Sequence, residues 1–590
     1  MKVTDVLKMH GTPEPHAALM RLGLLHERQP GMNVVFVSHQ WLSMHHPDPD
    51  GHQFAVLRDA LAALIDGSLH VEAHVVDIIY NTAPTMTAQF RRDLLDSYVW
   101  LDWFSVPQLA LKDILRNDAE IRTHQTLQAN AIQSIPSYVE NCETLLILAP
   151  DLQHVDSGMY CNYTSWLSRG WCRAELWFYL LSGVGERIPI VAFSPTNAHY
   201  MSKFAWHVNT IATGNFSVEA DRTIISYLGE LAAESKLQQL KEIGPTNHYR
   251  FYLSNRRYFM GQTSDAWDMP SFLEEFGFDS LEAATSDRSG MNPVMCAVLC
   301  EDMVLIRQLA EARADVNIPA EGCGAVSLYD GMTPLIVAAR TGQSPQMLSL
   351  LVDLKLGCCS GTSTKKADVQ ARTLSGVDAL LLCRNVAQIQ VLLEALIAPN
   401  HWQCHAVMPP MTPTALAKPP AVPASCPYQC DVLALRQGQM SMDSGCRKAA
   451  GDHSGSPRHA AALFTGIAET FGVCLGHGTV PKAKLLLACQ ANVNAQICMS
   501  GRLSWTSQLA QTQCSMLGFA TAPSQTRWWA SLPGSTPLAL ATMVGDQALM
   551  AFLLDHGAME LANDRGHFPE DLAVSGQHKE LLADLRLVSV

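Results

Sequence analysis

The chain has 590 residues, of which 48% are hydrophobic and 16% are charged. That length favours several domains, and the apolar content excludes disorder of the whole chain, because enough apolar surface is available to offset the entropy of ordering. The net charge of −14 argues against a nucleic-acid-binding protein, which needs a dense cationic surface to follow phosphates.

Membrane, secretory and metal-binding functions are not indicated either. No apolar run has the roughly 18–20 residues that span a bilayer, and the first residues lack the apolar core of a secretory leader. The 17 cysteines are dispersed without a CxxC pair, so neither a disulfide framework nor a zinc site is expected. We therefore predict a soluble cytoplasmic protein with reduced cysteines, no metal site, and no nucleic-acid or membrane partner.

After an N-terminal extension (1–30), residues 31–195 alternate short apolar runs with helical patterns. The runs lack alternation and are rich in branched and aromatic residues, which is typical of strands buried on both faces of a parallel sheet. They cover residues 33–37, 98–102, 144–149 and 188–193, and the helical patterns cover residues 53–65, 124–140 and 172–181. This order predicts an α/β domain with right-handed crossovers.

Polar and aromatic residues coincide at the ends of the first two predicted strands. The first strand is followed by Ser38, His39, Gln40 and Trp41, and the second ends at Asp102. Ligands of a parallel sheet collect beyond the carboxyl ends of its strands, so we predict a shared small-molecule site at this edge. Ser38 could instead cap a helix, His39 could be solvated, and Asp102 could cap a loop.

Three short motifs carry a family resemblance over about residues 30–195. Residues 35–40 (VFVSHQ) loosely match the VFxSxRx motif of the Toll/interleukin-1 receptor (TIR) superfamily, and residues 171–176 (WCRAEL) closely match its WCxxEL motif. Residues 98–108 are more similar to the YxWxDxxCxxQ motif of fungal heterokaryon-incompatibility (HET) domains, although the cysteine is replaced. The resemblance implies a flavodoxin-like, TIR-type fold with a parallel sheet.

In TIR domains that cleave NAD, the WCxxEL motif supplies a catalytic glutamate, which here is Glu175. The family match implies NAD as a substrate and no bound cofactor. Glu175 and Trp171 lie one helical turn apart, so both could face one cleft. A carboxylate near the ribose could stabilise the positive charge that develops as the nicotinamide–ribose bond breaks. The substrate-binding residues implied in this way are Ser38, His39, Gln40, Trp41, Asp102 and Trp171.

Structural roles for these residues stay open at this point. Glu175 could form an ion pair with Arg169 or Arg173, and Trp171 could pack in the core. The sequence also departs from the family pattern, because the two residues after Ser38 are not the basic residues that would meet phosphates.

Residues 196–289 predict a helical extension and connector, with helical patterns at 222–243 and 269–278 and no evident function. From residue 290 the chain contains imperfect repeats, clearest at 291–317, 331–352 and 534–558. They resemble the ankyrin repeat, in which Pro starts a helix, small residues let paired helices approach, and Leu residues fill the groove between repeats. The matching residues are Ala314, Asp315, Val316, Asn317, Thr333, Pro334, Leu335, Ala338, Ala339, Gly342, Thr536, Pro537, Leu538, Ala541, Gly545, Leu553, Leu554, Gly557 and Ala558.

Partial copies at 375–396, 456–462, 482–494 and 564–585 extend the predicted array. We therefore predict an all-α ankyrin-repeat solenoid at 290–398 and 456–590, with long insertions. The segment 399–455 is rich in proline, which cannot continue helix pairs. A second insertion at about 496–533 carries Trp505, Trp528 and Trp529, which either pack on the array or form a partner-binding loop.

Together these features predict an intracellular signalling protein. Its ankyrin array would bind a protein partner, while its TIR-like domain would hydrolyse NAD. The alternative is a non-enzymatic scaffold in which both regions bind proteins. The family resemblance also implies a homo-oligomer that forms through the TIR-like domain.

Overall fold

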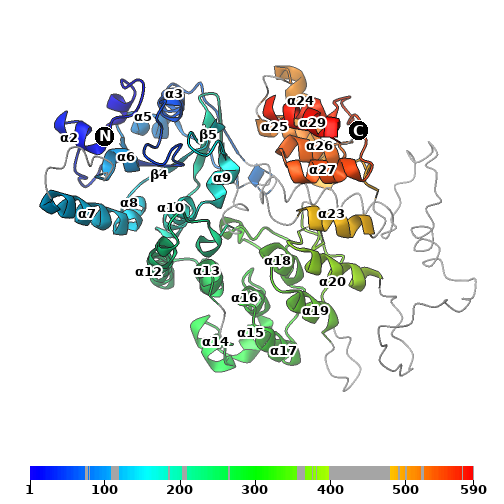
Figure 1. Ribbon diagram of the computed structural model, residues 1–590. Coiled ribbons are helices and arrows are strands. Elements are labelled where there is room, and N and C mark those ends of the chain that lie inside the picture. Colours follow the sequence, from blue (N-terminus) through cyan, green and yellow to red (C-terminus); the bar gives the residue numbers. More distant parts are fainter. Residues whose placement is uncertain are drawn as a thin grey trace, which may run out of the picture.

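The structure is a computed structural model in which an α/β region leads through connecting helices to a series of helix pairs (Figure 1). It describes residues 1–73, 77–78, 80, 82–107, 118–183, 187–201, 209–262, 266–354, 366–374, 377–380, 382–397, 479–488, 492–497, 501–519, 522, 524–573 and 576–588. Within these residues, no helix is both long enough and apolar enough to cross a membrane.

A sheet of six strands lies at the centre of the α/β region, in the order β2-β8-β7-β4-β1-β3. Its strands are β1 (Val34–His39), β2 (Val71–Glu72), β3 (Tyr98–Trp100), β4 (Thr144–Leu148), β7 (Ile190–Ser194) and β8 (Asn197–Tyr200). β1 pairs in parallel with β3 and β4, and β4 pairs in parallel with β7. The four predicted strands are therefore confirmed as parallel neighbours. The sequence did not reveal β8, which is antiparallel to β7, or β2, which pairs with β8.

Helices cover both faces of this sheet and enclose two separate cores. Alternate strand residues point to opposite faces, so Phe36 and Ile147 join one core whereas Val35 and Leu146 join the other. The first core includes α8 (Ile135–Glu140) and α10 (Gly170–Leu181), and the second includes α3 (His52–Asp66) and α5 (Ala88–Leu95). Burial of the strands on both faces explains why their sequences show no alternation.

Two predictions for this region differ from the structure in detail. The helical pattern at 124–140 is divided at Ser134 into α7 (Asp118–Gln133) and α8, because Pro136 near the start of α8 lacks the N–H that a continuous helix requires. The predicted N-terminal extension is packed on the sheet rather than separate from it. Its helix α1 (Val3–Val6) buries Val3 and Val6, and the Val3 N–H donates to the Ser97 carbonyl just before β3 at 2.9 Å.

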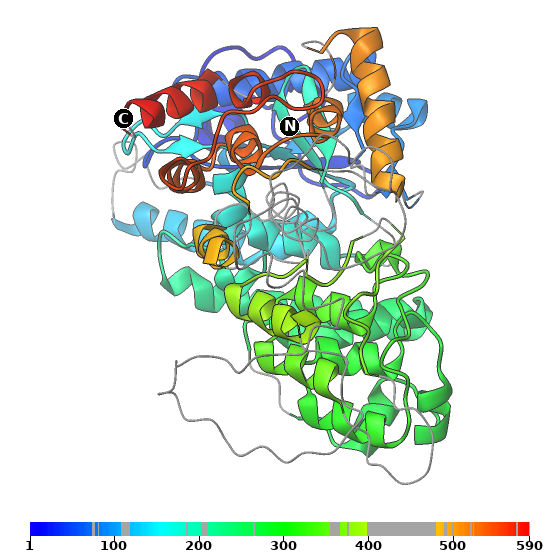
Figure 2. The ribbon, with the colours of Figure 1, turned by 90° about the vertical axis from the view of Figure 1, so that its right-hand side faces the viewer.

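The connector predicted at 196–289 is mainly helical, as expected. Its elements are η1 (Ile211–Thr213), α12 (Ala220–Ile243), α13 (Thr246–Met260), α14 (Met269–Glu275) and α15 (Leu281–Ser286). In Figures 1 and 2 the helices α12 and α13 lie between the sheet and the first helix pairs. The first core continues from Phe36 of β1 through Phe251 of α13 to Val298 of α16 (Pro293–Leu299) without interruption. The connector is thus an integral packing layer.

Short helices in pairs form most of the remaining described chain (Figure 2). After α16 they are α17 (Met303–Glu311), α18 (Pro334–Thr341), α19 (Pro345–Asp353), α20 (Val386–Ile397), α23 (Thr479–Ala488), α26 (Pro537–Val544), α27 (Gln547–Asp555), α28 (Pro569–Leu572) and α29 (Gly576–Val588). The side chains of Thr333 and Thr536 cap α18 and α26, and Gly342 and Gly545 end them with φ of +76° and +78°. The predicted starts of these two helices at Pro334 and Pro537 are therefore confirmed, and each helix ends at a glycine that matches the repeat.

The two predicted insertions have different outcomes. The segment 399–455 and the partial copy at 456–462 lie outside the described residues. The insertion at 496–533 forms two helices that pack on each other, α24 (Gly501–Leu517) and α25 (Ser524–Ser531). Trp529 is buried there and its ring lies 4.9 Å from that of Trp528, whereas Trp505 is 68% exposed. Trp528 and Trp529 therefore pack in the structure, whereas Trp505 is exposed.

Candidate functional site

Five of the predicted site residues meet at the carboxyl ends of β1 and β3. Ser38 and His39 are the last residues of β1, Trp41 follows them, and Asp102 begins the short helix α6 (Asp102–Ser105) after β3. Glu175 reaches the same place from the middle of α10. In the sheet β1 lies between β3 on one side and β4 on the other, so later parts of the chain extend the sheet in both directions from it. This change of direction is where ligands bind in open α/β sheets.

Ser38 connects Glu175 to a buried tryptophan. The Ser38 hydroxyl donates a hydrogen bond to Glu175 Oε2 at 2.5 Å and accepts one from Trp166 Nε1 at 3.0 Å. Ser38 and Trp166 are both fully buried, whereas Glu175 is half-buried. The serine therefore fixes one carboxylate oxygen and does not cap a helix.

The environment of Glu175 strongly favours its neutral form. Burial raises its pKa to about 8, the hydrogen bond from Ser38 opposes this shift, and the nearby charge of Asp102 adds to it. Neither Arg169 nor Arg173 forms an ion pair with Glu175 in the described structure. Arg173 instead donates to the carbonyls of Leu167 and Thr210 and to a threonine hydroxyl on η1. The carboxyl group is therefore largely protonated near neutral pH.

His39 and Asp102 form a second pair within the site. His39 Nε2 lies 2.8 Å from Asp102 Oδ1, and Asp102 Oδ2 accepts a hydrogen bond of 2.8 Å from Trp41 Nε1. The His39 side chain is only 6% exposed. Burial alone would lower the pKa of His39, but the adjacent carboxylate outweighs it and raises that pKa. The same contacts lower the pKa of Asp102 against the opposing effect of burial.

The cluster therefore holds two carboxyl groups in opposite protonation states. Asp102 is ionised and fixed by hydrogen bonds, whereas Glu175 is protonated at the same pH. Environments that separate the pKa values of two neighbouring acids are typical of sites that combine an acid with an electrostatic stabiliser. The arrangement can bind ribose or similar hydroxyl groups and stabilise a positive charge.

Two predicted site residues are not part of this cluster. The Gln40 side chain donates to the Asn162 carbonyl at 2.8 Å, before α9 (Tyr163–Ser168). The Trp171 indole donates to Asp221 of α12 at 2.9 Å, so the common cleft expected for Trp171 and Glu175 is not observed. Helix α10 packs against both β1 and α12, and the Trp171 side chain lies on the side that meets α12.

The sequence suggested that Trp171 would lie beside Glu175. In the structure it is Trp166 that is linked to Glu175, through the Ser38 hydroxyl. It lies on α9, whose start is fixed by a capping box in which Asn162 and Ser165 bond each other's backbone N–H groups. The Asn-x-x-Ser spacing could have predicted this helix start. It could not have predicted that the following tryptophan would reach Ser38.

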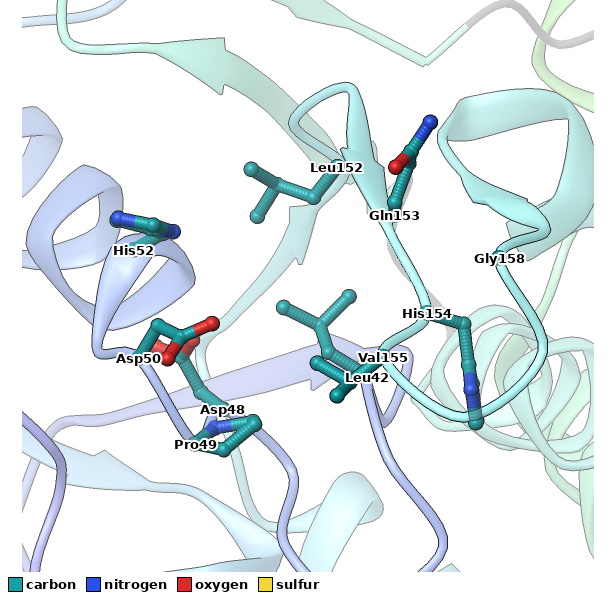
Figure 3. Close-up of a pocket in the computed structure, with 10 residues that line it drawn as sticks. All are labelled: Leu42, Asp48, Pro49, Asp50, His52, Leu152, Gln153, His154, Val155 and Gly158. Carbon is teal, nitrogen blue, oxygen red and sulfur yellow. The ribbon is translucent and has the colours of Figure 1, made fainter.

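A hollow of about 290 Å³ lies near the cluster, between the loop after β1 and the β5–β6 hairpin (Figure 3). The hairpin consists of β5 (Leu152–Gln153) and β6 (Tyr160–Cys161). Backbone hydrogen bonding of Val155 to Leu42 at 2.7 Å fixes its tip against the loop. Among the described residues, no three His, Cys, Asp or Glu side chains are grouped closely enough to hold a metal ion.

No protein-family model matches this sequence, and a search of curated proteins finds no match.

Proposed function

We propose that the protein is an intracellular signalling enzyme whose N-terminal region hydrolyses NAD to nicotinamide and ADP-ribose products. Glu175 is the proposed catalytic carboxylate. The observation that carries the proposal is the Ser38–Glu175 hydrogen bond of 2.5 Å beside the ionised Asp102, at the edge of the sheet where ligands bind.

The chemistry needs a carboxylate close to the ribose. As the bond between ribose C1′ and the pyridinium nitrogen breaks, its electron pair moves to the nitrogen and nicotinamide leaves as a neutral molecule. Positive charge develops at C1′, and water adds there and releases a proton. The substrate's pyridinium charge would favour ionisation of Glu175, because a nearby positive charge lowers the pKa of a carboxyl group. Ser38 would hold that carboxylate in place.

The strand order supports a TIR-type assignment for this region. The order β3-β1-β4-β7 corresponds to the 2-1-3-4 order of flavodoxin-like folds. The two residues after Ser38 differ from the basic residues of the family pattern, and neither is placed to meet a phosphate. His39 is paired with Asp102, and the Gln40 side chain bonds to the backbone. The pyrophosphate of NAD would therefore depend on backbone donors or on solvent.

In this proposal the helix pairs are an ankyrin-type array that binds a protein partner. Support comes from the capped helices that begin at Pro334 and Pro537 and from the buried alanines of α18. Successive pairs also contact one another, α16 with α18, α19 with α20, and α26 with α28. Stacking of successive pairs is how repeat proteins build a long binding surface.

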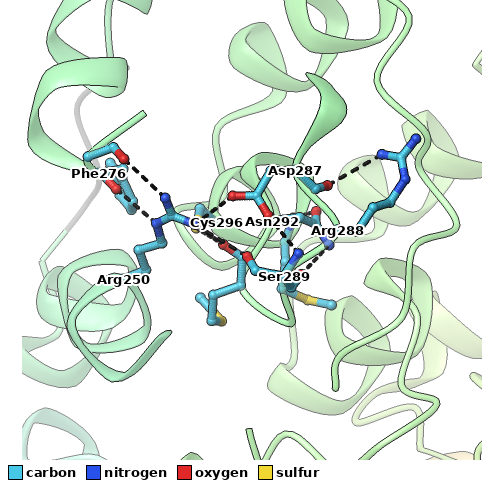
Figure 4. A network of polar contacts seen from close by, with 10 residues as sticks. Arg250, Phe276, Asp287, Arg288, Ser289, Asn292 and Cys296 are labelled. Atoms are coloured by element: carbon cyan, nitrogen blue, oxygen red, sulfur yellow. Dashed lines mark hydrogen bonds and ion pairs between the residues drawn. The ribbon is translucent and has the colours of Figure 1, made fainter. Parts of the chain in front are cut away.

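The array is joined firmly to the helix that carries Glu175. Arg250 of α13 donates to the Phe276 carbonyl at 2.8 Å and to Asp287 at 2.9 Å, and it also bonds the backbone just before α16 (Figure 4). Helix α13 packs on α12, and α12 packs on α10. The Lys236 ammonium of α12 donates to the Gly183 carbonyl beyond the end of α10. Partner binding to the array would therefore act on α10 through packed helices.

A non-enzymatic scaffold is the second candidate, and one observation favours it. Four apolar side chains are exposed on the loop after β1 and on the β5–β6 hairpin. Met44, Val155, Met159 and Tyr160 are 74%, 59%, 69% and 44% exposed. Such residues are common at protein interfaces. They would also suit the homo-oligomer that the family resemblance implies.

Incubation of the full chain with NAD tests the proposal, with free nicotinamide followed by chromatography. We expect release by the wild type, at least a hundredfold slower release by Glu175→Ala, and no change in Glu282→Ala, a control at an exposed position of α15. Circular dichroism would confirm that each variant is folded. No release by the wild type, even after clustering through a fused oligomeric tag, would favour the scaffold.

A further inference from the structure

Helix α24, in the insertion between two helix pairs, exposes an apolar stripe. Trp505, Leu509 and Met516 are 68%, 45% and 79% exposed. With the exposed Thr512 they follow the spacing i, i+4, i+7 and i+11, which places them on one face of the helix. In Figure 2, α24 is the long orange helix at the edge of the molecule. Single exposed apolar residues are normal, whereas a contiguous group of large ones marks an interaction surface.

The opposite side of α24 already packs within the fold. Ser507, Ala510 and Cys514 are buried, and their spacing i, i+3 and i+7 places them on the face away from the stripe. The Ser507 hydroxyl donates to the carbonyl of Trp529 on α25 at 2.9 Å. The stripe is therefore not the face that holds α24 on the protein, and its apolar residues are free for another contact.

The stripe lies in a part of the chain without charge. Between Arg502 and Arg527 the sequence has no Asp, Glu, Lys, Arg or His, although the whole chain has a net charge of −14. The exposed residues beside the stripe are Gln508, Gln513 and Ser515. Two copies of an acidic chain repel each other, so they meet at least cost where neither carries charge. Interface cores are likewise poor in charged residues and enriched in tryptophan and methionine.

The spacing of the stripe is symmetric. Trp505 and Met516 lie equally far along the chain from a midpoint between residues 510 and 511, and so do Leu509 and Thr512. A two-fold axis at that midpoint would relate two antiparallel α24 helices. Each Trp505 would then lie level with Met516 of the second copy, a favourable pairing of an aromatic ring with a thioether. The two Leu509 side chains would meet beside the axis.

We infer that the stripe on α24 is a self-association face, which a second copy of this chain covers in an antiparallel helix pair. The 17 residues of α24 make it about 25 Å long, and two such helices in contact bury roughly 600 Å² in total. Stable interfaces bury about 1,200 Å² or more, so the dimer should be weak, with a Kd on the order of 10–100 μM. The inference is independent of NAD hydrolysis at Glu175.

Sedimentation velocity of the full chain, from about 1 to about 300 μM, tests this inference. We expect the sedimentation coefficient to rise with concentration from the monomer value toward that of a dimer. Leu509→Lys brings two like charges together beside the axis and should weaken association at least tenfold. Val304→Lys is the matched control, because Val304 is an apolar residue of α17 that is 51% exposed. Circular dichroism would confirm that each variant is folded.

A pair of opposite charges tests the two-fold arrangement. Leu509→Glu should prevent association by itself, for the same reason as Leu509→Lys. An equimolar mixture of the two variants should associate about as tightly as the wild type, because a lysine then meets a glutamate across the axis.

Three results would overturn the inference. They are a wild-type chain that stays monomeric over the whole concentration range, association that Leu509→Lys does not weaken, and a mixture of the two charged variants that stays monomeric. Met159→Lys, at a 69% exposed position of the β5–β6 hairpin, identifies the competing face. Loss of association in this variant, with Leu509→Lys still associating, would place self-association in the α/β region. Because only mass is measured, the outcome does not depend on whether Glu175 cleaves NAD.

Discussion

Two ionisable side chains, Arg250 and Glu175, lie in surroundings that treat their charged forms in opposite ways. Arg250 donates hydrogen bonds to the carbonyls of Phe276, Gly277 and Met291 and pairs with Asp287. Within the described residues, the Glu175 carboxylate accepts a hydrogen bond only from the Ser38 hydroxyl. The arginine is compensated by its surroundings, whereas the glutamate carries a pKa of about 8.

The difference separates a structural role from a functional one. When the fold supplies all the acceptors of a buried charged group, that group favours a single arrangement of the elements around it. Arg250 does this at the junction between the connector and the helix pairs. A buried acid that its surroundings leave under-compensated is ready to change state when a ligand brings charge or donors. The comparison predicts that substitutions at the two positions will affect stability in opposite directions at alkaline pH.

The largest effect is expected at the junction. Arg250→Met should destabilise the protein by about 3–5 kcal/mol, because it removes the donor of several carbonyls and the ion-pair partner of the half-buried Asp287. Thermal unfolding followed by circular dichroism would measure this as a marked fall in the transition temperature of the connector and the first helix pairs.

Arg288→Met is the matched control, since this arginine of the same junction is exposed and, among the described residues, bonds to two backbone carbonyls. Its effect should lie within about 0.5 kcal/mol. Equal effects of the two substitutions would mean that the hydrogen bonds of Arg250 do not hold the junction.

A second prediction concerns the pH dependence created by Glu175. Its pKa is raised from 4.5 to about 8, so the folded state binds more protons than the unfolded state between these values. Stability should therefore fall as pH rises through this window. Glu175→Gln removes that loss, so relative to the wild type it should gain roughly 2–4 kcal/mol between pH 5 and pH 9.

Urea unfolding of both proteins at pH 5, 7 and 9 would measure the trend. Glu143→Gln is the control for replacing a hydrogen-bonded carboxyl group by an amide. Glu143 lies before β4, where its carboxylate accepts a hydrogen bond from the Val34 N–H at 2.6 Å. If the gain in stability is the same at all three pH values, the pKa of Glu175 is not raised, and its carboxyl group is not protonated near neutral pH.

Much of the fold could be read from the sequence, because burial on both faces leaves a local pattern. The runs at 33–37 and 144–149 have no alternation, and both are central strands. The edge strand β2 has only two residues and β8 four, which is too short for any pattern. The break in the helix at 124–140 had a visible cause in Pro136, since proline interrupts helices.

The site was predictable residue by residue only where strand ends determine position. Ser38 lies at the end of one parallel strand and Asp102 follows another, so they had to lie at one edge. The partner of a tryptophan side chain on a helix depends instead on which other element packs against that side of the helix. Trp171 turns to Asp221 on α12, a helix fifty residues away in the chain, whereas Trp166 turns to Ser38. No local spacing distinguishes the two.

The smallest expected effects on stability come from these two tryptophans, which the rate of nicotinamide release should distinguish. Trp171→Phe and Trp166→Phe each remove one indole N–H donor, at a cost of about 0.5–2 kcal/mol. If the hydrogen bond to Ser38 positions Glu175, Trp166→Phe should slow nicotinamide release about tenfold, whereas Trp171→Phe should leave it nearly unchanged. Release kinetics and transition temperatures would be measured for both variants. The opposite ranking would return Trp171 to the site, as its spacing from Glu175 first suggested, and would mean that substrate binding rearranges the start of α10.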